Sequence, residues 1–202
     1  VAVASDELAN KVVEEVSKNS TNEKQTLSAQ VLKAIVESDS GKIDIINDEV
    51  KDTMIKQTIV SAQNQQEGTG VQQDQDMTSI VSDIIVNTNT ETGSKIIEEL
   101  NNSSTNTEND LSLKVISAIS EKDTTKLNTL SENNKEQIET LAETAIKNAD
   151  ASNESADLIA KVVANASNEL VNKMVGEVSK NSIDENQALS AKVMKSIVET
   201  NP

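Results

Sequence analysis

The 202-residue sequence contains no cysteine, histidine, tryptophan, tyrosine or phenylalanine, and it has one proline and five glycines. Without histidine and cysteine the chain lacks the most common general base and the usual ligands of zinc and copper. Pockets for small molecules are normally lined with aromatic groups, and this chain has none. We therefore expect no enzyme activity, no cofactor and no metal site.

Basic residues are also scarce: 34 acidic side chains face 18 basic ones, a formal net charge of −16 at pH 7. Nucleic-acid binding needs clustered Lys and Arg that neutralise phosphates, so we expect no nucleic-acid partner. No apolar run approaches the ~20 residues of a membrane-spanning helix, so we expect no membrane insertion. The acidic excess is expected to form a solvated face that keeps a long protein soluble.

What the sequence does contain is an internal repeat. Residues 163–201, laid over residues 1–39, give 25 identities in 39 positions, which chance does not produce. A looser copy between them aligns at a shift of 84 residues from the first copy and 78 from the last. The period is therefore about 81 residues, the mean of the two shifts.

Within each period, apolar residues recur at steps of three and four, which predicts helices rather than strands. The predicted first helix covers about 152–180 in the last copy and 75–101 in the middle copy. The second lies in SKNSTNEKQTLSAQVLKAIVE, residues 17–37, and a third helix follows it. The predicted fold is thus all-α, an elongated array of tandem three-helix repeats that pack as bundles or as a solenoid.

The predicted domain organisation follows the phase of this repeat. Residues 1–73 form a partial first repeat, residues 74–151 a complete one and residues 152–202 a partial last one. The fragment then begins inside a first helix and ends after a second. Two interpretations stay open: an arbitrary boundary in a longer array, or a subunit whose ends are completed by neighbours in a head-to-tail polymer.

The apolar stripes supply the candidate core and self-association residues. Burial of about five aliphatic side chains per helix contributes on the order of 10 kcal/mol, against an ordering cost of roughly 1–2 kcal/mol per residue. A single unit is therefore marginal, and a stack is stable. The candidates are Val12, Val16, Leu27, Val31, Ile35, Leu111, Val115, Ile119, Leu170, Met174, Val178, Leu189, Val193 and Ile197.

Several short motifs predict where the helices begin and end. Ser20 with Glu23, and Ser182 with Glu185, have the spacing of a capping box. Gly41 stands where a helix can end in a left-handed residue, and Glu67-Gly68-Thr69-Gly70 predicts a second break.

One pair of carboxylates has a spacing that a calcium site could use. Asp74 and Asp76 precede a predicted helix, but the segment lacks the glycine and the terminal glutamate of an EF-hand loop. Carboxylates are favoured at helix N-termini in any case, so no calcium site is predicted.

The leading hypothesis is a structural protein, a segment of a cell-surface or extracellular filament, stalk or giant adhesin joined by head-to-tail packing of apolar helix faces. Its expected partner is itself, as a homopolymer or as a longer array of the same repeat. In architecture the pattern resembles the three-helix repeats of spectrin-like and large bacterial surface proteins, without the aromatic core residues of spectrin.

Two alternatives remain open. A surface binding module would grip a host or matrix protein, although binding hot spots favour Trp, Tyr and Arg. An intracellular coiled-coil scaffold or signalling rod would show long unbroken heptads, whereas this sequence has regular breaks.

Overall fold

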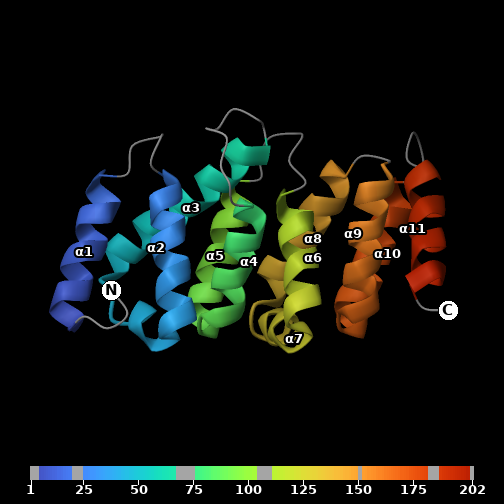
Figure 1. Cartoon of the computed structure of the whole chain (residues 1–202). Helices are drawn as coiled ribbons and strands as arrows, with labels where there is room; N and C mark the ends of the chain where they lie inside the picture. The colour runs from blue at the N-terminus through green and yellow to red at the C-terminus, as the bar shows by residue number, and fades with distance from the viewer. Residues whose placement is uncertain are drawn as a thin grey trace. The chain divides into compact units, whose positions relative to one another are not determined.

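The computed structural model describes residues 5–19, 25–66, 76–103, 111–149, 152–181 and 187–200. Within these ranges the chain forms helices and no strand (Figure 1). The prediction of an all-α fold is confirmed. By its internal contacts the chain divides into two units, Val1–Glu99 and Leu100–Pro202, which are described separately.

In the first unit, helix α2 is the central element and packs on α1, α3, α4 and the short 3₁₀ helix η2. Its neighbour α3 also packs on α4 and α1. The bounds are α1 Asp6–Asn19, α2 Gln25–Ser38, η2 Ser40–Ile43, α3 Asp48–Gln66 and α4 Met77–Asn87, and α5, Thr90–Ser103, begins in this unit.

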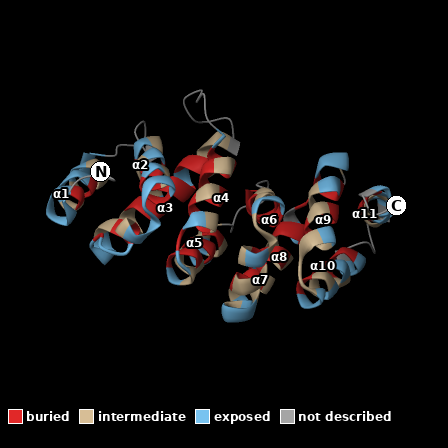
Figure 2. Cartoon of the chain, turned by 60° about the horizontal axis from the view of Figure 1, so that its bottom comes forward, coloured by how far each residue is buried: buried red, intermediate tan, exposed pale blue. Residues whose placement is uncertain are grey.

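In the second unit, α9 packs on α6, α10 and α11, while α8 packs on α6, α7 and α10. Buried residues, drawn red in Figure 2, run along α6 and α9. The bounds are α6 Leu111–Lys122, α7 Thr124–Asn133, α8 Lys135–Asn148, α9 Asn153–Asn165, α10 Asn168–Asn181 and α11 Gln187–Thr200.

The helix boundaries recur at the offsets found in the sequence. Helices α1, α5 and α10 begin at residues 6, 90 and 168 and end at 19, 103 and 181, so both bounds shift by 84 and then by 78. The preceding residues are Ser5, Asn89 and Ser167, whose side-chain oxygens accept the backbone N–H three residues on at 3.4, 2.8 and 3.5 Å. Side chains that accept such a donor favour helix initiation, so the local structure follows the period.

The prediction of one long first helix is wrong. The range 152–180 holds two helices, α9 and α10, separated where Ala166 adopts an extended backbone (ψ 165°). The range 75–101 is broken in the same way at Thr88 (ψ 169°), between α4 and α5. The apolar stripe continues across both breaks, so residue spacing alone does not reveal them.

The short segment after α2 also differs from its prediction. Gly41 lies inside η2 and does not end a helix in a left-handed conformation. The segment is organised by Asp39, whose carboxylate accepts the backbone N–H of Gly41 at 3.2 Å. Asp123, 84 residues later, caps α7 by accepting from the N–H of Lys126 at 2.9 Å. The predicted capping boxes Ser20/Glu23 and Ser182/Glu185, and the glycines of 67–70, lie outside the described residues.

The cap at Asp123 yields a first prediction. Substitution Asp123→Ala removes the acceptor of the Lys126 N–H and should lower the free energy of unfolding by about 1 kcal/mol. Asp123→Asn keeps an acceptor oxygen and should cost much less. Urea unfolding followed by circular dichroism measures both, and equal losses for the two variants would show that the cap does not depend on this hydrogen bond.

Candidate self-association surface

Most of the candidate core residues lie inside the structure. Nine of the fourteen are buried: Ile35, Leu111, Val115, Ile119, Leu170, Met174, Val178, Leu189 and Val193. Val16, Val31 and Ile197 are half-buried.

Two candidates are exposed: the side chains of Val12 and Leu27 are 38% and 41% accessible. The reason is the choice of helix face. Helix α1 buries Ala9 and Val13. Val13 follows the predicted residue Val12 directly, so the helix covers a neighbouring face. Helix α2 buries Leu32 and Val36 of the flanking stripe together with Ile35 of the predicted stripe, and it leaves Leu27 exposed.

Exposed aliphatic residues gather on the first and last helix pairs of the described chain. Helices α1 and α2 expose Leu8, Val12 and Leu27, and helices α10 and α11 expose Val175, Met194 and Val198. Only Ile45 and Val60 join them among the large exposed hydrophobic residues in the described ranges. We call the group of Val175, Met194 and Val198 on α10 and α11 the C-terminal face.

The six equivalent positions in α5 and α6 are all buried. Shifts of 84 and 78 residues lead to Thr92, Ile96, Ile97, Leu111, Ile116 and Ser120, none more than 3% exposed. The same repeat positions are thus compatible with full burial.

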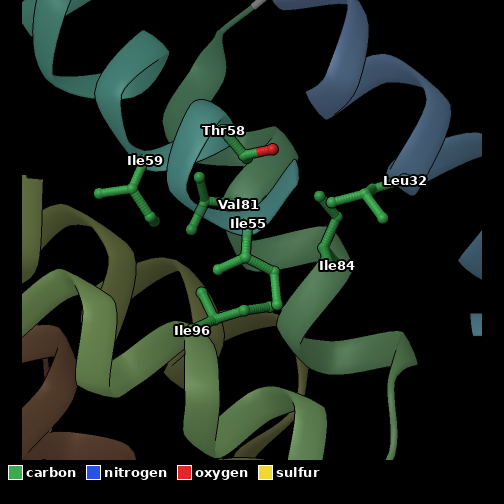
Figure 3. Close-up of a pocket in the computed structure, with 7 residues that line it drawn as sticks. All are labelled: Leu32, Ile55, Thr58, Ile59, Val81, Ile84 and Ile96. Atoms are coloured by element: carbon green, nitrogen blue, oxygen red, sulfur yellow. The ribbon is translucent and has the colours of Figure 1, made fainter. Parts of the chain in front are cut away.

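The first unit shows how one of these faces is covered. Leu32 of α2 meets aliphatic side chains of α3, α4 and α5, which point toward one another in Figure 3. The space among them does not admit a water molecule. It is therefore a packed core and no ligand site. Its lining residues are Leu32, Ile55, Thr58, Ile59, Val81, Ile84 and Ile96.

A second depression lies between α7, α8 and α10 in the second unit. Its volume of about 110 Å³ holds a few water molecules at roughly 30 Å³ each, far from the roughly 300 Å³ or more of a typical ligand pocket. Its floor is Ile138 and Leu170, and at its rim Lys135 pairs with Glu169 and Glu139. This pairing raises the pKa of Lys135 and supplies no free charge for a ligand.

Ion pairs join α2 to α4 and α6 to α9, with one partner of each pair at the same repeat position and the other one helical turn apart. Lys33 of α2 lies 2.8 Å from Asp83 of α4, and the hydrogen bond to that carboxylate raises the pKa of Lys33. In the second unit Lys161 of α9 takes the position of Asp83, and it lies 2.9 Å from Glu121 of α6. The acidic Asp83 of α4 is thus replaced by the basic Lys161 in α9, while an ion pair still joins each pair of helices.

A charge cluster links α8 to α10. Glu143 accepts from Lys147 at 2.5 Å and from Lys173 at 3.2 Å, and these bonds lower the pKa of the Glu143 carboxyl. Glu177, only 3% exposed, pairs with Lys180 at 2.6 Å and with Lys173 at 3.7 Å. The cluster ties two helices together and leaves no open carboxylate group.

Acidic side chains in the described ranges cap helices and form ion pairs. Within the described ranges, no three acidic side chains come together to hold a metal ion. Asp76 instead caps α4, accepting from the Thr78 N–H at 3.0 Å, and Asp74 lies outside the described residues. Among the described helices none has the length and apolar character to cross a membrane.

No protein-family model matches the sequence, and neither the curated proteins nor the solved structures give a significant match.

The two faces of α2 yield a second prediction. Leu32→Ala empties a fully buried position and should lower the free energy of unfolding by about 2–5 kcal/mol. Leu27→Ala, on the exposed face of the same helix, should cost under about 1 kcal/mol. Chemical unfolding compares them directly, and similar losses would mean that the Leu27 face is covered in solution.

The Glu143 cluster yields a third, pH-dependent prediction. Because its pKa in the folded chain lies below the ordinary value of 4.5, the stabilisation is complete above about pH 5 and is lost as the pH falls through the folded pKa. The gap in melting temperature between wild type and Glu143→Gln should therefore shrink on acidification. Glu98→Gln, an exposed site on α5, is the control and should show no such trend; a gap that stays constant with pH would contradict the prediction.

Proposed function

We propose that this chain is a structural, non-enzymatic protein in which copies of an about 81-residue helical repeat associate head to tail through their apolar helix faces. The product is an elongated filament, stalk or adhesin segment at the cell surface or outside the cell.

One observation carries this proposal. The aliphatic positions that are exposed on the α1–α2 and α10–α11 pairs are buried at every equivalent position of α5 and α6. Exposed aliphatic patches of this kind are typical of interaction sites. The α1–α2 and α10–α11 pairs therefore expose apolar surface at positions that are buried in α5 and α6.

The chemistry of these faces suits self-association. They consist of Leu, Val and Met side chains, without the Trp, Tyr or Arg that dominate hot spots for unrelated partners. Heterologous contacts between such faces build open chains of copies. The net charge of −16 opposes sideways aggregation of the product.

The fourth prediction concerns assembly. The purified chain should form elongated particles at high concentration, seen by electron microscopy and as heavier species in analytical ultracentrifugation. Met194→Lys with Val198→Lys should shift the distribution to monomers, because charged side chains cannot be buried unpaired in an apolar contact. The control Val60→Lys changes another exposed aliphatic residue, on α3, and should leave assembly unchanged. Monomeric wild type at every concentration would end the proposal.

A further inference from the structure

Equivalent helices of the repeat could pair with the wrong partners. Helices α2 and α6 are equivalent at a shift of 84 residues, and α4 and α9 are equivalent at a shift of 78. Within the two units, α2 packs on α4 and α6 packs on α9. Apolar burial is not directional, so it does little to exclude the exchanged pairs, in which α2 takes α9 and α6 takes α4 through these same faces. Swapping of this kind is a characteristic failure of repeat proteins.

The charged residues at the two contacts differ between the copies. In the first unit Lys33 of α2 lies 2.8 Å from Asp83 of α4. In the second unit Lys161 of α9 lies 2.9 Å from Glu121 of α6. The cation therefore comes from the α2 side in the first contact and from the α9 side in the second.

Substitutions at two repeat positions produce this reversal. Asp83 of α4 is replaced by Lys161 in α9, and Lys33 of α2 is replaced by Ser117 in α6. Ser117 is 1% exposed and carries no charge. Helix α6 thus presents the Glu121 carboxylate to α9 without the lysine that α2 has at the equivalent of Ser117.

An exchanged pairing would place two carboxylates together at α4. Through the face that α2 occupies, α6 would bring Glu121 toward Asp83. It would supply no cation, because Ser117 stands in place of Lys33. The side chain of Asp83 is 20% accessible, the least among the four partners of the two ion pairs. Partly buried charges are screened less than exposed ones, so the repulsion is largest at this position.

At α9 the exchanged pairing would bring two lysines together. Helix α2 would place Lys33 toward Lys161. Glu37 would remain as an acidic group at the position of Glu121, and it lies 3.7 Å from Lys33 within α2. The charges at this position therefore discriminate less strongly than those at α4.

A second ion pair adds to the selection at α9. Lys114 of α6 lies 3.5 Å from Glu154 of α9. The equivalent residues are Gln30 in α2 and Asp76 in α4. Because Gln30 is uncharged, α2 would offer Glu154 no cation, and the exchange would lose this pair.

From these contacts we propose that the charges select the partner of each helix, α4 for α2 and α9 for α6. The specificity-determining residues are Lys33, Asp83, Glu121 and Lys161. Exposed ion pairs add little stability, but like charges brought together in a contact exclude wrong partners. The selection therefore acts on the difference between correct and exchanged pairing. It concerns helices that belong to one chain and does not depend on the proposed association of copies.

The fifth prediction separates selection from stabilisation. The double variant Lys33→Glu with Asp83→Lys keeps an ion pair between α2 and α4 and reverses its direction. Its α2 then matches Lys161 of α9, and its α4 matches Glu121 of α6. The native contact keeps its ion pair, while the exchanged pairs no longer bring like charges together.

The measurement uses the absence of cysteine from the sequence. Ala34→Cys on α2 and Asn87→Cys on α4, both at exposed positions, carry spin labels. Each labelled chain is unfolded in urea and refolded with an excess of unlabelled chain of the same charges, so that every distance measured by double electron–electron resonance lies within one chain. The wild-type charges should give one distance population. The double variant should give a second one, above the roughly 10% that a disfavoured minor state reaches.

Two matched variants guard against folding damage. Glu121→Lys with Lys161→Glu removes the same discrimination from the α6–α9 side and should also give a second population. All four substitutions together make both exchanged pairs like-charged again and should restore the single population. A single population in both double variants, or a second population that the fourfold variant retains, would overturn the inference. Circular dichroism checks that each chain keeps its helices.

Discussion

The structure depends on one constraint: the equivalent helices α2, α6 and α11 carry apolar residues on more than one side. Helix α2 buries Leu32 and Val36 while leaving Leu27 exposed, and α11 buries Leu189 and exposes Met194. One neighbour cannot cover two faces. In α6 the equivalents of both faces are buried together. A helix with apolar residues on two faces is fully desolvated only when both faces are covered.

The buried core within the described ranges is aliphatic and contains no aromatic ring. Small buried residues such as Ser112, Ser117 and Ser120 alternate with Val and Ile along α6. The ion pairs at the helix contacts have a lesser role, because exposed pairs contribute at most about 1 kcal/mol. The exchange of sign between Asp83 and Lys161 supports this order: the packing of α2 on α4 and of α6 on α9 is kept although the charges are reversed.

The sequence was sufficient for the helical class and for most buried positions, since steps of three and four report directly on a helix face. It was insufficient for the breaks at Thr88 and Ala166, because the apolar stripe continues through residues that leave the helix. It also failed at Val12 and Leu27, where the helix has apolar residues on adjacent faces and only the neighbouring elements decide which is covered. The caps at Ser5, Asn89 and Ser167 could have been found, since all three are good N-cap types at equivalent positions.

The candidate surface was harder to predict, because equivalent residues can be buried in one copy of the repeat and exposed in another. Asn10 and Asn172 lie in similar sequences, ELANK and ELVNK, yet Asn10 binds the backbone at residues 45 and 47 while Asn172 is exposed. Only the structure separates a position in use from an equivalent one that is open.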